Sequence, residues 1–142
     1  MSRLVLDASV LVKWILQDGD GEPDTAQALA LFESVRTGRA SLVQPIHWLA
    51  EVAAVCVRLK PDIAAPVTGL LYAMEIPVRN SVDVYHRACA LAVELDHHLF
   101  DTLYHAVALD LRDATLVTAD RRYYRKARRH GAIALLADFS VP

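Results

Sequence analysis

The chain has 142 residues, of which 54% are hydrophobic, and its formal net charge at pH 7 is −2. This length fits one domain that buries about two-thirds of its unfolded surface, and the apolar fraction excludes a disordered chain. No apolar run approaches the roughly 20 residues of a membrane-spanning helix, and no signal peptide is legible at the N-terminus. We therefore expect one cytoplasmic domain over residues 1–142, with no membrane contact. Cys56 and Cys89 are expected to be buried free thiols.

Short apolar runs and longer amphipathic runs alternate along the chain. The short runs predict strands at 3–6, 41–44, 114–117 and 133–136, and an edge strand at 76–78. Helical spacing predicts helices at 10–16, 25–37, 45–59, 62–74, 81–96, 101–111 and 120–130. The acidic, glycine-containing stretch 18–24 predicts a loop. This order favours an α/β fold in which helices cover both faces of a mainly parallel sheet.

Four acidic residues interrupt the apolar runs. Asp7 follows the first predicted strand and Asp120 follows the strand at 114–117, whereas Glu51 and Asp101 lie in apolar helical stretches. A buried carboxylate is costly unless its charge is compensated. In parallel sheets, ligands bind beyond the carboxyl ends of the strands. We therefore expect Asp7 and Asp120 at that edge, with Glu51 and Asp101 leaning over it from helices.

A cluster of these four carboxylates requires a compensating cation. Two like charges about 4 Å apart repel by roughly 4 kcal/mol at an effective dielectric constant near 20. Mg²⁺ and Mn²⁺ prefer oxygen ligands and assist the hydrolysis of phosphate esters. The alternatives are structural: Asp7, Asp101 and Asp120 could cap helices, and Glu51 could be an exposed residue beside an apolar stripe.

The segments that carry these acids resemble the PIN-domain family. They are Val5-Leu6-Asp7-Ala8-Ser9-Val10-Leu11-Val12-Lys13-Trp14, Glu51 in its helix, Asp101-Thr102-Leu103-Tyr104-His105-Ala106, and Leu116-Val117-Thr118-Ala119-Asp120. The opening motif and the length look most like the toxin nucleases of VapBC toxin–antitoxin pairs. The resemblance covers essentially the whole chain, with its motifs in order.

The resemblance implies a single PIN-like nuclease domain over residues 1–142, with a Rossmann-like, three-layer α/β/α sandwich and a central, mainly parallel sheet. Its activity would be that of a Mg²⁺- or Mn²⁺-dependent endoribonuclease. The family's four acids map to Asp7, Glu51, Asp101 and Asp120 as catalytic and metal-binding residues, and its hydroxyl before the last acid maps to Thr118. Ser9 matches a small hydroxyl residue of the first motif. Its role is either a hydrogen bond behind the metal site or a helix cap.

Basic residues follow the last acid directly. Arg121, Arg125 and Arg128 share a face of the predicted helix and are expected to contact RNA phosphates. The alternative is a solvated face that suits the helix dipole. Tyr123 and Tyr124 could stack on unpaired bases or pack inward.

Histidines offer a different metal chemistry. His97, His98 and His105 flank Asp101, so a zinc site is conceivable. Their spacing is not specific and no cysteine joins them, so we favour a site without a histidine ligand.

Apolar residues of the first helices point to a partner. They exceed what a central sheet can cover, unless core packing uses them all: Val10, Leu11, Trp14, Ile15, Ala28, Leu29, Phe32, Trp48 and Leu49. The resemblance implies a hydrophobic groove for the amphipathic tail of a cognate antitoxin, whose Arg or Lys could enter the carboxylate cluster. It also implies a homodimer.

Other function classes fit less well. A haloacid-dehalogenase-like phosphatase would need a second Asp where Ser9 stands, and a receiver domain would need paired acids on its first strand. Dinucleotide binding lacks a glycine-rich turn after a strand. A non-catalytic module that binds RNA or a partner on the same fold is the serious alternative.

Overall fold

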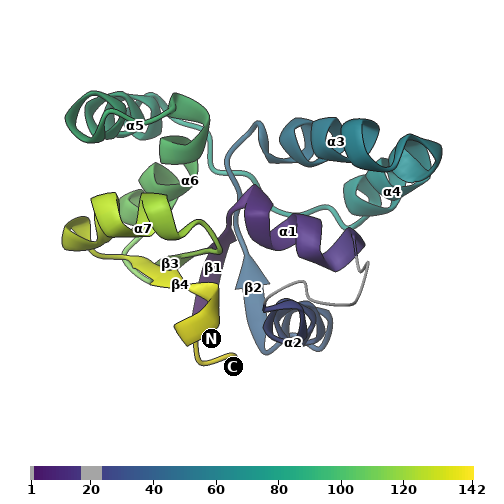
Figure 1. Cartoon of the computed structure of the whole chain (residues 1–142). Coiled ribbons are helices and arrows are strands. Elements are labelled where there is room, and N and C mark those ends of the chain that lie inside the picture. The colour runs from purple at the N-terminus through teal and green to yellow at the C-terminus, as the bar shows by residue number, and fades with distance from the viewer. Residues whose placement is uncertain (1, 17–23) are drawn as a thin grey trace.

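A computed structural model describes residues 2–16 and 24–142 of the chain. Within them, a four-stranded sheet has the order β2-β1-β3-β4, and every neighbouring pair is parallel (Figure 1). The strands are β1 (Ser2–Leu6), β2 (Ala40–Leu42), β3 (Ala114–Thr118) and β4 (Ile133–Leu135). Leu4, Val5 and Leu6 are all buried. Because successive side chains of a strand point to opposite faces, helices must cover both faces of the sheet.

The helices are α1 (Ala8–Ile15), α2 (Thr25–Arg36), α3 (Trp48–Leu59), α4 (Pro61–Ala73), α5 (Val82–Leu95), α6 (Leu99–Asp110) and α7 (Arg121–Ala127). Short 3₁₀ turns follow at η1 (Arg128–His130) and η2 (Leu136–Asp138). Helices α1 and α6 both contact β1 and β3, α2 contacts β2, and α7 contacts β4. The expected three-layer α/β/α sandwich is therefore confirmed. The helical pairs α3–α4 and α5–α6 lie on opposite sides of the carboxyl end of β1 (Figure 1).

A buried glutamine holds the end of β1 in place. The side-chain amide of Gln44 accepts a hydrogen bond of 2.7 Å from Leu6 N and donates one of 2.9 Å to Leu6 O. Gln44 is fully buried, and its backbone also bonds to Pro77 and Arg79. It therefore continues the pairing of β1 beyond the end of β2 and fixes the chain just before Asp7.

Three expected elements differ from the structure. The edge strand at 76–78 is reduced to an isolated bridge between Gln44 and Val78, since Pro77 has no N–H to donate to a ladder. The helix expected from residue 45 begins at Trp48, after a turn. The helix expected over 120–130 ends at Ala127 and continues as a 3₁₀ turn. The loop expected at 18–24 lies, apart from Asp24, outside the described residues.

The two cysteines have different environments. Cys56 is buried, as expected, but Cys89 is exposed on α5, because apolar neighbours in the sequence do not decide which side of a helix faces the core. None of the helices in the described ranges is long and apolar enough to cross a membrane.

Candidate active site

Asp7 lies between the end of β1 and the start of α1. It is the N-cap of α1, and its Oδ2 accepts hydrogen bonds from Ser9 N (3.1 Å) and Ser9 Oγ (2.5 Å). The backbone N–H of Asp7 donates to Val117 O on β3. Capping is therefore one role of Asp7, and it aims the carboxylate across the edge of the sheet.

Ser9 joins two corners of this edge. Its hydroxyl donates to Asp7 Oδ2 and accepts a hydrogen bond of 3.1 Å from Ala119 N, just after β3. The helix-cap alternative for Ser9 is wrong because Asp7 occupies the N-cap position. Ser9 instead fixes the first acid relative to the loop that carries the last one.

Asp120 caps α7, and Thr118, the hydroxyl residue that the sequence singled out, holds its backbone N–H. Its Oδ1 accepts from Tyr123 N at 3.0 Å, as the capping alternative expected. The hydroxyl oxygen of buried Thr118 accepts from Asp120 N at 3.0 Å. The cap bond engages Oδ1 of Asp120 and does not involve its Oδ2.

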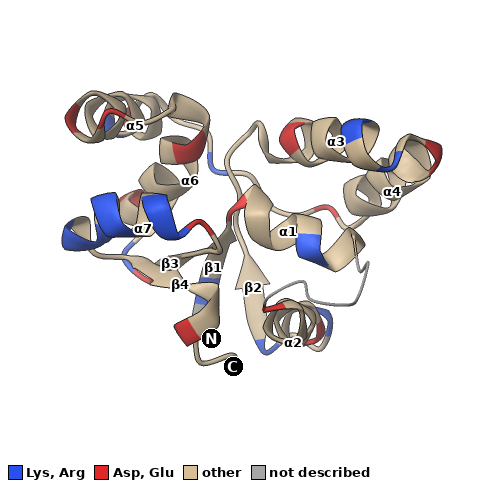
Figure 2. Ribbon diagram, in the orientation of Figure 1, with Lys and Arg blue, Asp and Glu red and all other residues tan. Residues whose placement is uncertain are grey.

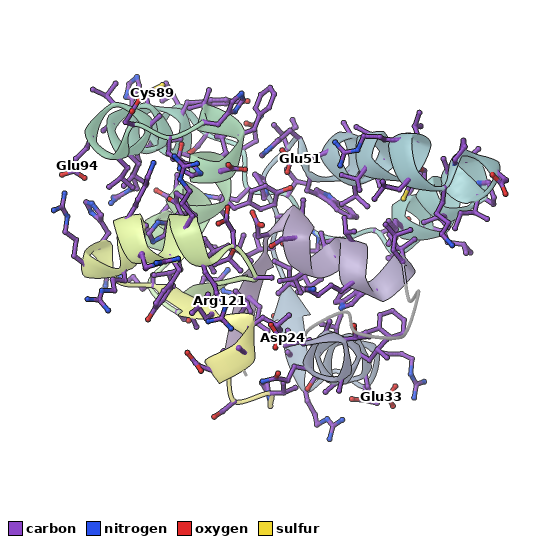
Figure 3. All side chains as sticks on the ribbon, viewed as in Figure 1. Asp24, Glu33, Glu51, Cys89, Glu94 and Arg121 are labelled. Atoms are coloured by element: carbon purple, nitrogen blue, oxygen red, sulfur yellow. The ribbon has the colours of Figure 1, made fainter. Side chains whose placement is uncertain are left out.

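Glu51 reaches the edge from the first turn of α3. Its side chain is 23% exposed, so the alternative of an exposed surface residue is wrong. Its Oε1 accepts a hydrogen bond of 2.9 Å from the hydroxyl of Tyr104, which is fully buried on α6. Burial and the nearby charge of Glu51 raise the pKa of Tyr104, so this hydroxyl stays protonated and donates. In Figure 3, Glu51 lies between the two helical pairs.

Asp101 lies in the first turn of α6, but it does not cap the helix. The N-cap is His98, whose Nδ1 accepts from Phe100 N, so the capping alternative for Asp101 is wrong. Its Oδ2 lies 2.9 Å from Nε2 of His97. The other ring nitrogen of His97, Nδ1, lies 3.3 Å from Nζ of Lys126. Because an ammonium group can only donate, Nδ1 accepts and Nε2–H donates to Asp101.

The four carboxylates are within electrostatic reach of one another. Burial raises the pKa of Asp7 to about 6, against the hydrogen bonds from Ser9, and the charges of Asp101 and Asp120 raise it further. Burial likewise raises the pKa of Glu51 to about 7, with added repulsion from Asp7 and Asp101. Acidic segments of α3, α6 and the starts of α1 and α7 surround the carboxyl edge of the sheet (Figure 2). Charge interactions thus link Asp7 with the other three acids that the sequence selected, whereas the compact group of possible ligand atoms among the described residues contains only Asp101 and Asp120 of the four.

The donor set suits a divalent cation. One ligand atom from each of His97, Asp101 and Asp120 lies within 4.8 Å of the others. Raised pKa values at Asp7 and Glu51 mean that their negative charges are poorly compensated by the chain itself, and a cation among carboxylate oxygens would supply that compensation. The sequence interpretation disfavoured a histidine here, yet His97 belongs to this group.

The other two histidines near Asp101 do not complete a zinc site with it. His98 is exposed and caps α6. His105 is buried; Tyr123 Oη lies 2.9 Å from its Nδ1, and its Nε2 lies 2.8 Å from Gly131 O. Both of its ring nitrogens are therefore engaged behind α7. In the described ranges, the group of possible metal ligands contains His97 alone among the histidines.

Helix α7 places basic side chains beside the acids. Arg121, Arg125 and Arg128 are all exposed, and Lys and Arg cover much of α7 in Figure 2. Tyr123 is buried and its ring contacts His97 at a centroid distance of 4.8 Å, so it packs inward and cannot stack on a base. Figure 3 shows Arg121 at the start of this helix, directly after Asp120.

The sequence interpretation did not single out three contributors to this site, Gln44, Tyr104 and Lys126, and it weighed His97 only as a zinc ligand. Tyr104 lies three residues after Asp101, within the quoted motif, and His97 lies four residues before Asp101. These spacings were a readable signal in the sequence. Gln44 and Lys126 gave no local signal, because their partners are distant in the sequence.

The chain matches the sequence family described as "PIN domain" over residues 4–129. No curated protein matches it with significant similarity. PIN domains are generally nucleases that use divalent metals. The match covers the two strands and the helices that carry the four acids, and the chain therefore belongs to the PIN domain family.

Proposed function

We propose that this protein is a Mg²⁺- or Mn²⁺-dependent endoribonuclease with Asp7, Glu51, Asp101 and Asp120 as its catalytic and metal-binding residues. The observation that carries the proposal is the convergence of these four carboxylates, two of them with raised pKa values, at the carboxyl edge of a PIN domain. The whole chain, residues 1–142, would form this one nuclease domain.

The side chains divide the work by their surroundings. A bound divalent ion would polarise a phosphoryl oxygen and lower the pKa of a water molecule. Asp7, Asp101 and Asp120 offer carboxylate oxygens to hold it. Glu51 keeps Oε2 apart from its bond with Tyr104, so this oxygen can also face the cation. Ser9 and Thr118 hold the first and last acids in place.

Contact with RNA is assigned to the exposed face of α7 and η1. Arg121, Arg125 and Arg128 are exposed, and basic residues continue along α7 in Figure 2. Phosphate contacts from such residues position a strand without reading its sequence.

Metal dependence and RNA binding separate an enzyme from a non-catalytic binder. Purified protein should cut single-stranded RNA with Mg²⁺ or Mn²⁺, lose cleavage in EDTA, and regain it when the metal is restored. Retention of the RNA should be measured in the same samples. Unchanged binding with no cleavage under any metal condition would favour the binding module and reject the enzyme.

We further propose that the protein is the toxin of a type II toxin–antitoxin pair. The opening motif supports this assignment, and so does a run of apolar pockets beside α4. One pocket of about 470 Å³ contains Phe32 and Met74, a second of about 550 Å³ contains Phe32, Met74 and Ile76, and a third of about 490 Å³ contains Ile76. The pockets are neighbours because they share these residues, and we call them together the α4 groove.

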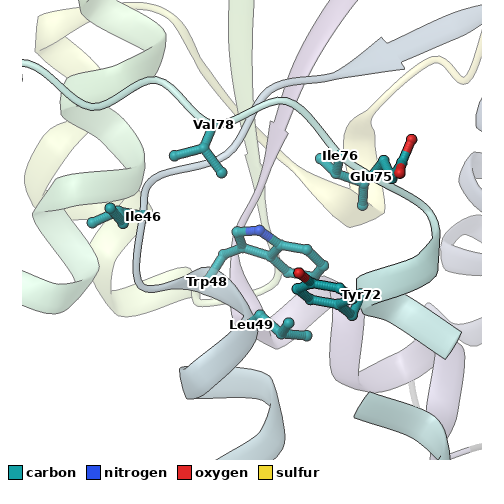
Figure 4. Close-up of a pocket in the computed structure, with 7 residues that line it drawn as sticks. All are labelled: Ile46, Trp48, Leu49, Tyr72, Glu75, Ile76 and Val78. Carbon is teal, nitrogen blue, oxygen red and sulfur yellow. The ribbon is translucent and has the colours of Figure 1, made fainter. Parts of the chain in front are cut away.

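The α4 groove uses part of the surface that the sequence indicated, because Trp14, Ile15, Phe32, Trp48 and Leu49 line its pockets. Val10, Leu11 and Ala28 are instead buried in the core. Exposed Leu70 and Tyr72 of α4 add to the groove. Figure 4 shows Tyr72 beside Trp48 and Leu49 at one end, with Glu75 at the rim. An amphipathic antitoxin tail with apolar residues at helical spacing would suit this groove.

Co-expression tests the toxin assignment. The small protein encoded by the neighbouring open reading frame should co-purify with the chain and suppress its ribonuclease activity. Leu70→Glu in the α4 groove should weaken the complex and leave RNA cleavage intact. A chain that is harmless to its host and unaffected by that neighbour would reject the toxin role without rejecting the nuclease. A homodimer is proposed from the family resemblance, and sedimentation would test it.

A further inference from the structure

An exposed aromatic ring lies next to the carboxylate cluster, beside the start of α3. Phe100 directly precedes Asp101 and is 51% exposed. Its ring centroid lies 5.3 Å from that of His47 and 4.9 Å from that of His98. His47 in turn lies 4.9 Å from Tyr104, the partner of Glu51. An aromatic row therefore runs from the acids to the surface.

This ring borders a pocket that includes one of the proposed catalytic acids. His47, Ala50, Glu51, Ala54 and Phe100 line a pocket of about 290 Å³. Apart from Glu51 and the imidazole of His47, its walls are apolar. The pocket thus joins an apolar surface directly to the carboxylates.

The position of Phe100 is fixed rather than incidental. Nε2 of His47 donates a hydrogen bond of 2.8 Å to Phe100 O, which ties the start of α6 to the start of α3. About half of the favourable burial of a Phe side chain is lost at this exposure, because the gain scales with the apolar area removed from water. Core packing therefore does not account for an aromatic residue here.

Two chemically different surfaces flank the acids. Exposed arginines of α7 follow Asp120, and the apolar pocket includes Glu51. A nucleic-acid strand has the matching two parts, a charged backbone and flat apolar bases. A strand crossing the acids can therefore place phosphates on α7 and a base in the pocket.

We propose that Phe100, supported by His47, is a stacking platform for an unpaired base next to the phosphate that is cleaved. This inference rests on the proposed ribonuclease function and narrows its substrate to single-stranded RNA or unpaired loops. A base within a duplex is already stacked on both faces and cannot enter the pocket. Stacking accepts any base, so the platform selects strand state rather than sequence.

The test uses a short adenine-rich single-stranded RNA that carries 2-aminopurine, whose fluorescence falls when it stacks. Binding is measured in an Asp7→Asn background, so that the RNA is not cut. Phe100→Leu keeps an apolar side chain but removes the ring, and Phe100→Trp keeps a ring. Tyr85→Leu, which removes an exposed ring on α5, is the matched control.

Phe100→Leu should weaken binding by about 5- to 150-fold and remove the quenching, because one base–aromatic stack is worth about 1–3 kcal/mol. Phe100→Trp should retain both, and Tyr85→Leu should change neither. Ala54→Leu, which narrows the pocket from α3, should weaken binding with Phe100 intact. RNA with an abasic site in place of the stacked base should bind Phe100→Leu and its parent equally.

Three results would overturn the platform. Equal binding by Phe100→Leu and its parent would do so, even if the intact enzyme cuts RNA. If Phe100→Leu lost as much affinity for duplex or abasic RNA as for the single strand, the substitution would have disturbed the site as a whole. A change only in self-association or antitoxin binding would assign Phe100 to a protein interface. Failure of the ribonuclease proposal would be a separate result. The intact protein would then not cut RNA, although binding would still quench the 2-aminopurine fluorescence.

Discussion

Nε2 of His97 lies 2.9 Å from Oδ2 of Asp101, and the hydrogen of that bond belongs to the histidine. Lys126 fixes this arrangement by donating to the other ring nitrogen. Lys126 also donates to Asp96 O, so it is anchored at two points. A chain of hydrogen bonds from α7 thus orients a carboxylate on α6.

His97→Ala is therefore expected to weaken Mg²⁺ and Mn²⁺ binding by a similar factor, about 10- to 100-fold, because it loosens a proposed metal-binding carboxylate. Calorimetric titration of the metal-free protein measures both affinities. His98→Ala, at the exposed neighbour, is the control. A loss confined to Mn²⁺ would mean instead that the imidazole binds the metal directly, since imidazole nitrogen suits Mn²⁺ better than Mg²⁺.

Tyr104→Phe removes one hydroxyl from the site. The hydrogen bond from Tyr104 lowers the pKa of Glu51, so its loss should raise that pKa above about 7. Metal binding requires deprotonated carboxylates, so the pH midpoint of Mg²⁺ binding should move upward. Titrations of metal affinity between pH 6 and pH 9 would show the shift, and Tyr72→Phe should show none. An unchanged midpoint would mean that Glu51 does not contribute to metal binding.

Stability without metal should depend on pH through Asp7. Its folded pKa of about 6 is above its ordinary value of 3.8, so the folded state holds this proton more tightly than the unfolded state. The resulting stability is lost as pH rises from about 4 to about 6. Burial lowers the pKa values of His47 and His105, which gives the opposite trend, so a comparison with Asp7→Asn is needed.

Asp7→Asn should accordingly raise the melting temperature of the metal-free protein by roughly 5 °C at pH 8 and by much less at pH 4.5. Thermal unfolding in EDTA measures the difference. Saturating Mg²⁺ should reverse the order of the two melting temperatures at pH 8, because the Asp7 carboxylate is a charged ligand and the amide that replaces it in Asp7→Asn is not. Equal effects of the substitution at both pH values would show that Asp7 is not electrostatically strained.

Arg125→Ala tests the assignment of RNA contacts to α7. Removing one phosphate contact should weaken binding modestly for all sequences and reduce the dependence of log affinity on log salt concentration by about one. Fluorescence anisotropy at several salt concentrations gives the slope. Arg58→Ala, on the far part of α3, should leave it unchanged. An unaltered slope for Arg125→Ala would return α7 to an ordinary solvated face.

The sequence predicted the order of elements well because strand and helix periodicities are local. It selected the four acids because a carboxylate stands out within an apolar run, and sheet topology gave a reason for them to meet. Contacts between distant segments were beyond it. Gln44 pairs with Leu6 across 38 positions, and Lys126 reaches His97 across 29. Neither glutamine nor lysine is unusual where it stands, so only the fold reveals these contacts.

Errors in the sequence interpretation have a similar cause. Ser9 was a reasonable cap, but Asp7 two residues earlier took that position, and the serine hydroxyl bonded to it instead. Val10 and Leu11 of α1 were used by the core, whereas Trp14 and Ile15 of the same helix also line the α4 groove. Composition alone does not distinguish apolar residues that are buried from those left for a partner.

The central claim is that the carboxylates converge in order to catalyse RNA cleavage. The most direct measurement is the rate of single-stranded RNA cleavage by purified Asp101→Asn and Asp7→Asn proteins in Mg²⁺ or Mn²⁺, beside Asp138→Asn at an exposed acid outside the cluster. Each of the first two should lose activity by more than about 100-fold, exceeding the loss expected for a residue that only supports a metal-binding group. Asp138→Asn should retain full activity. Full activity in folded Asp101→Asn or Asp7→Asn protein would contradict the account.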